Sequence, residues 1–293
     1  MGAGESLLAT DSWSLRRQRA EALQTRYPFA AEVLALYAAL LVVQEQAYTA
    51  ALADGVRPVE IADYSAARVL PAIVAVTKAH GPALLADAAQ AAVETDAGAA
   101  IVRAWLEGAE QTPVERYLAR AAAGPVIEAL GPAAGDVCAG PRNERHCPLC
   151  GGLPQVSVLK PSSDGLVGAR RALLCSRCGA EWGYPRMTCI ACGERETDRL
   201  AVYAEEGTAE LETSGSVVRG LAGAFDPDGS RAGPWFPHLR IEACQTCRRY
   251  ILNVDATRDP RAAPIVDELA AVPLHLYAQE QGFRRVIPNL MEL

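Results

Sequence analysis

The stretch ALLCSRCGAEWGYPRMTCIACG, residues 172–193, carries two Cys-x-x-Cys pairs, each followed by glycine. CPLCGG at 147–152 precedes it, and IEACQTC at 241–247 follows it. A Cys-x-x-Cys turn places two sulfur atoms on one side of a tight loop. Two such turns facing each other form a tetrahedral sulfur cage of the kind that zinc or iron accepts. A single pair is weak evidence, whereas four pairs in one half of the chain indicate metal centres.

The residues that follow the pairs strengthen this interpretation. Gly151, Gly179 and Gly193 stand where the turn needs a residue that tolerates positive φ, so that N–H groups can point at the sulfurs. The fourth pair has Arg248 at this position and is a weaker match. Eight paired cysteines with four ligands per ion predict two metal sites. The candidate ligands are Cys147, Cys150, Cys175, Cys178, Cys189, Cys192, Cys244 and Cys247.

Grouping of the pairs in sequence order is the simplest arrangement. The first two pairs would close across a hairpin-like loop, and the last two across a longer excursion. The alternative joins the two central pairs and leaves the outer pairs to meet over nearly a hundred residues. A redox dithiol would need a thioredoxin-like setting with a helix beginning at the first cysteine, which is missing here. Electron transfer through iron stays open, because the sequence does not distinguish zinc from iron.

The one unpaired cysteine and the four histidines of the chain belong to no motif. Cys138 is unpaired, and we interpret it as a free thiol. His146 adjoins Cys147, but with four pairs available no histidine ligand is needed. His80, His238 and His275 have no acid or nucleophile spaced near them in any recognisable motif, so we expect no catalytic site.

Composition indicates a soluble globular protein. Of 293 residues, 50% are apolar and 22% are charged, and the net charge of -7 argues against a general nucleic-acid binder. The N-terminus MGAGESLLATDSW lacks the basic start and apolar run of a secretory signal. The most apolar stretch, 29–43, is too short to span a bilayer and predicts a buried core helix. We therefore expect a cytoplasmic protein without membrane insertion, where thiols stay reduced.

The sequence of the first half predicts helices throughout, arranged as a bundle of five to seven helices. The residues that recur on one helical face are Leu34, Tyr37, Leu41 and Tyr48. Thr112 and Glu115 form a capping box, and the helix they start is expected to break near Gly124-Pro125. Pro71 is expected to break another helix.

The two halves meet at a linker rich in glycine and proline, residues 131–146. Short strand-like runs follow, at 155–160, 172–175 and 199–204. Residues 205–238 are expected to form a flexible excursion, and a helical pattern returns at 264–282. The sequence thus predicts an α+β protein: a helical bundle, then two rubredoxin- or zinc-ribbon-like four-cysteine modules, then a C-terminal helix. The predicted domains are 1–135, 136–263 and 264–293.

These motifs together resemble the FdhE family, the formate dehydrogenase accessory proteins. The resemblance rests on CPLCGG, the stretch 172–193 with Trp182 and Arg186, the segment IEACQTCRRYILNVD from residue 241, and the closing RRVIPNL. Glu242 ahead of the fourth pair and Tyr250 after it are part of the pattern. The first half fits loosely, through an Arg-rich first helix and a later Gln44.

The resemblance implies a cytoplasmic protein that is not an enzyme. It implies a maturation factor that binds the catalytic subunit of a molybdenum- or tungsten-dependent formate dehydrogenase. It also implies that the eight paired cysteines hold two metal ions, iron or zinc, with iron favoured by the resemblance. A rubredoxin-like electron-transfer or redox-sensing protein is the alternative, and a zinc-ribbon nucleic-acid binder is disfavoured by the charge. A homodimer stays open.

Overall fold

A computed structural model describes residues 5–94, 97–161, 169–205, 219–221 and 234–292. The chain divides into two compact units. The first comprises Met1–Gly152 with two short segments, Arg177–Ala180 and Asn289–Leu293, and the second comprises Leu153–Ser176 and Glu181–Pro288. The predicted domain boundaries at residues 135 and 263 stay a prediction.

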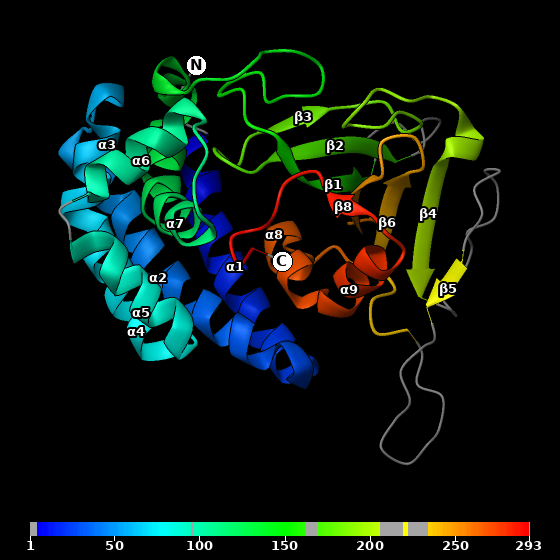
Figure 1. The fold of residues 1–293 in the computed structure, drawn as a ribbon, viewed down its shortest axis with the longest axis horizontal. Coiled ribbons are helices and arrows are strands. Elements are labelled where there is room, and N and C mark those ends of the chain that lie inside the picture. Colours follow the sequence, from blue (N-terminus) through cyan, green and yellow to red (C-terminus); the bar gives the residue numbers. More distant parts are fainter. Residues whose placement is uncertain (1–4, 95–96, 162–168, 206–218, 222–233, 293) are drawn as a thin grey trace. The chain divides into compact units, whose positions relative to one another are not determined.

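The first unit is helical, as the composition of the first half predicts (Figure 1). Its described residues form α1 Glu5–Arg26, α2 Ala31–Asp54, α3 Ile61–Tyr64, α4 Leu70–His80, α5 Ala83–Glu94, α6 Gly98–Glu107 and α7 Pro113–Leu130. A turn of π-helix, Ser65–Val69, precedes α4, with Pro71 in the first turn of α4. The expected break at Pro71 therefore takes the form of a π turn, because proline supplies no N–H to the preceding turn.

The α2 helix is the core helix of this unit. The predicted face is confirmed, since Leu34, Tyr37, Leu41 and Tyr48 are all buried. The helical segment that contains the apolar stretch 29–43 is longer than that stretch, because α2 continues to Asp54. By length and composition alone, Pro28–Asp54 passes the test for a membrane span, a test that buried core helices of soluble proteins also pass.

The capping box of α7 is confirmed, but the expected break at Gly124-Pro125 is absent. Glu115 N–H donates to Thr112 Oγ1 at 3.4 Å, and Thr112 N–H donates to the Glu115 carboxylate at 2.8 Å. The helix continues through Pro125 to Leu130. Pro125 has no N–H to offer the carbonyl of Ala121 four residues earlier, and the side chain of Gln44 supplies this donor at 3.0 Å.

The second unit is built on one mixed eight-stranded sheet, which the sequence did not predict. The strand order is β3-β2-β1-β7-β6-β4-β5, with β8 beside β7. The β1/β2 hairpin is antiparallel, and β1 pairs parallel with β7. The strands are β1 Pro154–Lys160, β2 Arg170–Cys175, β3 Glu181–Gly183, β4 Leu200–Glu205, β5 Arg219–Leu221, β6 Leu239–Cys244, β7 Arg249–Asp255 and β8 Arg284–Arg285. The predicted strands at 155–160, 172–175 and 199–204 are confirmed.

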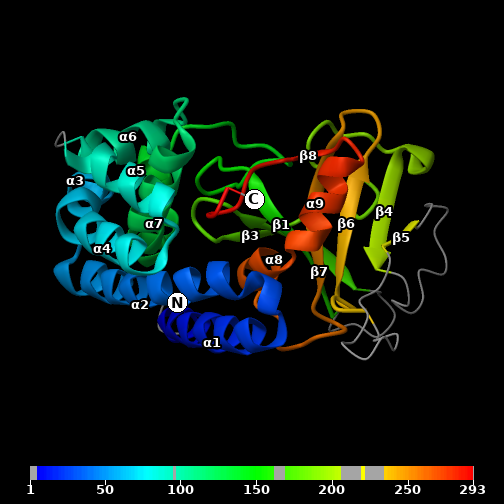
Figure 2. The ribbon, with the colours of Figure 1, turned by 60° about the horizontal axis from the view of Figure 1, so that its bottom comes forward.

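Two helices cover one face of this sheet, α8 Pro264–Ala270 and α9 Val272–Glu280 (Figure 2). The predicted C-terminal helical segment is confirmed, but it is divided before Pro273, which stands in the first turn of α9. Tyr203 of β4 meets Tyr277 of α9, with ring centroids 5.6 Å apart. Side chains alternate between the faces of a strand, so Arg240 and Glu242 of β6 point to the face away from these helices.

Residues 206–218 and 222–233 account for most of the predicted excursion at 205–238, which therefore lies mainly outside the described residues.

Candidate metal centres

The eight paired cysteines gather into two groups of four in the predicted sequence order. Cys147, Cys150, Cys175 and Cys178 form the first group; Cys189, Cys192, Cys244 and Cys247 form the second. Within each group all sulfur atoms lie within 4.8 Å of one another, and none of the cysteines forms a disulfide.

The separations between sulfur atoms fit a tetrahedral metal site. Cys178 Sγ lies 3.5 Å from Cys147 Sγ and 3.4 Å from Cys150 Sγ. In the second group, the sulfur atoms of Cys189 and Cys247 lie 3.7 Å apart, as do those of Cys192 and Cys244. A tetrahedron with metal–sulfur bonds of about 2.3 Å has edges of about 3.8 Å. Both groups therefore offer the donor set and spacing that a zinc or iron ion requires, and the geometry does not distinguish the two metals.

All four pairs use the same left-handed turn. Gly151, Gly179 and Gly193 have φ of 71°, 67° and 83°. Arg248, the weaker match in the sequence, also has a positive φ, 56°. Its side chain donates to Gln245 at 2.6 Å, and its guanidinium carbon lies 4.0 Å from the centroid of the Phe283 ring. These contacts stabilise a conformation that an arginine rarely adopts.

Arg177, inside the second pair, ties the first group to the linker. Its Nη1 donates to the carbonyls of Ala139 at 2.8 Å and Cys150 at 3.0 Å. Its guanidinium carbon also lies 5.5 Å from the centroid of the Trp105 ring. The loop of the first pair is thus held by hydrogen bonds to its backbone in addition to any metal.

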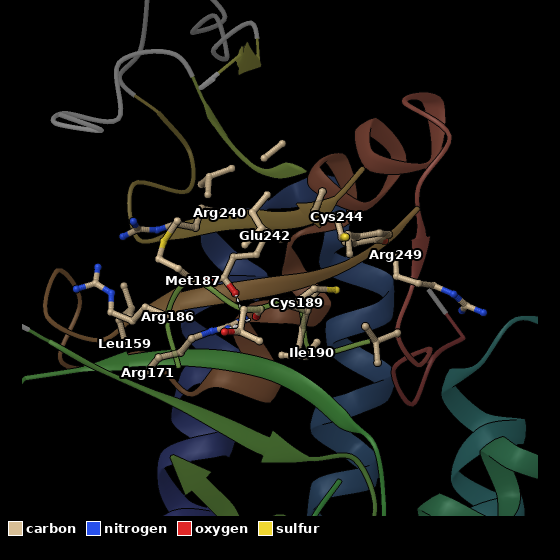
Figure 3. A pocket seen from close by; sticks show the side chains of 18 residues that line it. Leu159, Arg171, Arg186, Met187, Cys189, Ile190, Arg240, Glu242, Cys244 and Arg249 are labelled. Carbon is tan, nitrogen blue, oxygen red and sulfur yellow. Dashed lines mark hydrogen bonds and ion pairs between the residues drawn. The ribbon is translucent and has the colours of Figure 1, made fainter. Parts of the chain in front are cut away.

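Arg171 of β2 likewise donates hydrogen bonds to the backbone of the loop that carries the third pair, in the second group. Its Nη1 donates to the carbonyls of Pro185 at 2.9 Å and Thr188 at 3.1 Å, which lead into Cys189. Its Nε donates to Ser157 Oγ at 2.9 Å, and its Nη2 pairs with Glu242. Figure 3 shows Arg171 and Glu242 pointing toward one another from β2 and β6. Glu242, part of the family-like pattern, therefore orients the arginine that holds the third pair.

An apolar cluster packs against the loop of the third pair. Its buried members are Leu173, Tyr184, Ile190 and Ile251, with Trp182 and Val286 packed against them. Ile190 stands inside the third Cys-x-x-Cys pair, so Trp182, part of the family-like pattern, contributes to packing against the loop of that pair.

The two groups differ in exposure. In the first, three cysteines are buried and Cys178 is intermediate; in the second, Cys192 is exposed. Burial raises the pKa of Cys189 to about 11 and also raises the pKa of Cys247. Burial by itself would raise the pKa of Cys244 too, but N–H groups of Cys247 and Thr246 donate to its sulfur and lower the pKa.

The remaining candidates from the sequence lie outside both groups. Cys138 is a buried free thiol, as expected, and burial raises its pKa. His146 Nδ1 lies 2.8 Å from the Asn143 side-chain oxygen and joins neither group.

Sequence reasoning missed one buried acid–base pair. His238 Nε2 lies 2.8 Å from Asp267 Oδ1, and both side chains are buried. The second carboxylate oxygen of Asp267 accepts from Ala263 N–H at 2.7 Å, at the start of α8. No spacing in the sequence reveals this contact, because it joins β6 to α8 across 29 residues.

Fold and site together define a class: a helical unit joined to a mixed sheet whose loops carry two four-sulfur centres. Residues 229–292 match the family model "FdhE, C-terminal domain". An FdhE homolog from Aquifex aeolicus is 32% identical over 148 residues, 50% of this chain and 42% of the relative. One from Haemophilus influenzae (strain PittEE) is 26% identical over 188 residues, 64% of this chain and 45% of the relative.

A solved structure extends the likeness in fold to nearly the whole chain. The crystal structure of the FdhE protein from Pseudomonas aeruginosa matches with a TM-score of 0.63 and 20% identity, over 97% of this chain and 96% of that one. The resemblance to the FdhE family is confirmed, by the match of residues 229–292 to the model of its C-terminal domain, by the curated relatives and by the shared fold. The matched part spans less than half of the length of the two curated relatives, so their activities as whole proteins enter only as proposals.

Proposed function

We propose that this chain is a non-catalytic accessory factor in the maturation of a molybdenum- or tungsten-dependent formate dehydrogenase. In this proposal it acts in the cytoplasm and binds the catalytic subunit of that enzyme. The observation that carries the proposal is the FdhE match in a chain with two four-sulfur groups at tetrahedral spacing.

The same proposal assigns the eight paired cysteines as ligands of two metal ions, iron or zinc. When bound, each ion crosslinks two loops that are distant in sequence and stabilises their folded arrangement. The chain's own residues prepare these loops: Arg177 holds the backbone of the first group, and Arg171 holds that of the second.

An anaerobic affinity pull-down from native cells tests this function. The tagged chain should retain a formate dehydrogenase catalytic subunit, identified by mass spectrometry. Retention should be lost when Cys175 and Cys178 are replaced by Ser and kept in Cys138→Ser, which removes a thiol outside both groups. Absence of the subunit from the wild-type pull-down, with the metals bound, would contradict the proposal.

Exposure of Cys192 favours a second candidate, a redox-sensing or electron-transfer role for the second group. An exposed thiolate ligand shortens the path for electrons and gives oxidants access to the centre. The test is voltammetry of the iron-loaded chain. A reversible one-electron couple that disappears in Cys192→Ser supports this role, and a redox-silent second centre excludes it.

A further inference from the structure

A cavity of about 110 Å³ opens beside the second four-cysteine group, within the second unit (Figure 3). Its apolar wall includes Leu159, Ile190, Val202 and Val286. Met187 lines it with a side chain that is 38% exposed. Cavities of roughly 150 Å³ accept a benzene ring, so this cavity has room for one aliphatic side chain.

The polar lining of the cavity is dominated by arginine. Arg171, Arg186, Arg240 and Arg249 line it, against a single carboxylate, Glu242. Arg171 pairs with Glu242, and Arg240 pairs with Asp255. Within the described part of the chain, neither Arg186 nor Arg249 has a carboxylate within ion-pair distance. No carboxylate of the described residues pairs with either of these two positive charges, in a chain with a net charge of -7.

These two arginines lie at opposite ends of the cavity. Figure 3 shows Arg249 on the side of Cys244, with its guanidinium pointing outward, where Nη1 donates to the Arg285 carbonyl at 2.7 Å. Arg186 lies at the other end, beside Arg240 and close to Met187. Burial lowers the pKa of Arg240, and the charges of Arg258 and Arg186 lower it further against the opposing effect of Asp255 and Glu242. The Arg186 end therefore carries an excess of positive charge that an anion would relieve.

We infer that this cavity is the docking pocket for an acidic segment of a protein partner. An aliphatic side chain enters the cavity, and a neighbouring carboxylate pairs with Arg186 at its rim. Met187 suits this task, because an unbranched thioether adapts its shape to the side chain that it covers. A carboxylate beside a desolvated apolar wall gains more from pairing with arginine than one in open solvent. The identification of the partner as the formate dehydrogenase subunit rests on the proposed function; the binding chemistry does not.

Peptides test the chemistry directly on the metal-loaded full chain. The probe is a heptapeptide with a neutral fluorescent label and Leu-Asp-Glu at its centre, flanked by glycine and serine. Two comparison peptides replace Asp-Glu by Asn-Gln, or Leu by Gly. Fluorescence anisotropy at low ionic strength should show binding of the first and about tenfold weaker binding of both others. Equal binding of all three, or full competition by inorganic phosphate at millimolar concentration, would overturn the pocket as a peptide site.

Substitutions locate the binding on the protein. Arg186→Glu should weaken binding of the acidic peptide by about tenfold or more, because it reverses the rim charge without removing any ion pair of the described residues. Arg261→Glu is the matched control, since this side chain is 89% exposed and does not line the cavity. Equal weakening by both substitutions would show a nonspecific charge effect and overturn the inference.

The same variants separate this inference from the proposed function in the pull-down. Loss of the subunit with Arg186→Glu but not with Arg261→Glu supports both. Retention of the subunit by Arg186→Glu, at the wild-type amount, overturns the pocket while the accessory role stands. If the wild-type chain retains no subunit and still binds the acidic peptide, the proposed function fails and the pocket stands.

Discussion

The guanidinium of Arg171 donates a 3.1 Å hydrogen bond to the carbonyl oxygen of Thr188, the residue immediately before Cys189. Through this bond and the one to Pro185, a strand of the sheet holds the loop that presents the third cysteine pair. Arg171 is buried and also pairs with Glu242, so its charge is compensated where water does not reach it. The loop of the second four-cysteine group is thus held by a residue that lies outside the group.

Arg171→Lys should weaken the second centre and spare the first. The single ammonium group of lysine cannot replace the arginine guanidinium, which contacts Ser157, Thr188 and Glu242 at the same time. Buried acceptors therefore lose their donors. We expect a loss of about 2 kcal/mol in the free energy of unfolding. Metal analysis after mild chelation should find one ion per chain instead of two. Arg170→Lys, at the exposed neighbour on the same strand, should retain both, and equal metal content in the two variants would contradict this assignment.

Metal release should occur in two phases, with the second group losing its ion first. Cys192 is exposed, whereas three cysteines of the first group are buried, so a chelator reaches the second group more readily. Stopped-flow absorbance with a chromogenic chelator, on the zinc-loaded chain, measures both phases. Cys244→Ser should remove the faster phase and leave the slower one. A single phase for the wild-type chain, or loss of the slower phase in this variant, would contradict the predicted order.

The Gln44 side chain should stabilise the helical unit only while Pro125 is present. Gln44→Leu leaves the carbonyl of Ala121 without a donor, which should cost about 1–3 kcal/mol in the free energy of unfolding. Pro125→Ala restores an N–H four residues after Ala121, so Gln44→Leu should cost much less in that background. Urea unfolding of the wild type, both single variants and the double variant measures this coupling. Equal costs of Gln44→Leu in the two backgrounds would show that the hydrogen bond is not the cause.

Stability should decrease in mild acid because of His275. Burial lowers its pKa from the usual 6.5 to about 4, so the unfolded chain takes up the proton first as the pH falls. The contribution of the neutral histidine is complete above about pH 6.5 and is lost between that value and about 4, to a total of about 3 kcal/mol. His275→Asn should flatten this part of the pH dependence, measured by urea unfolding between pH 7 and 5. His80→Asn, at an exposed position, should leave it unchanged; parallel curves for all three proteins would contradict the assignment.

The cysteine groups could be predicted from the sequence because their chemistry is local. Each turn carries two cysteines at a fixed spacing and is followed by a residue in the left-handed conformation. Arg248 adopts this conformation too, although it is not a glycine. Sequence order then sufficed to pair the turns correctly. The strand-like runs were readable for the same reason, since strand preference is a property of short runs of neighbouring residues.

The supports of these sites could not be predicted, because they are contacts between distant residues. Arg171 reaches Thr188 across 17 positions, and Gln44 reaches Ala121 across 77. Each depends on which strands or helices become neighbours. The same reason explains why Pro125 was expected to break its helix: the compensating donor lies on another helix. The single sheet was missed because β1 pairs with β7, almost a hundred residues further along the chain.

X-ray absorption spectroscopy of the full chain, purified without oxygen, tests the central claim most directly. Metal analysis of the same sample gives the number of ions per chain. The account predicts two ions, each surrounded by four sulfur atoms at about 2.3 Å. A single ion per chain, or a coordination shell containing nitrogen or oxygen in place of sulfur, would contradict the assignment of the eight cysteines to two four-sulfur centres.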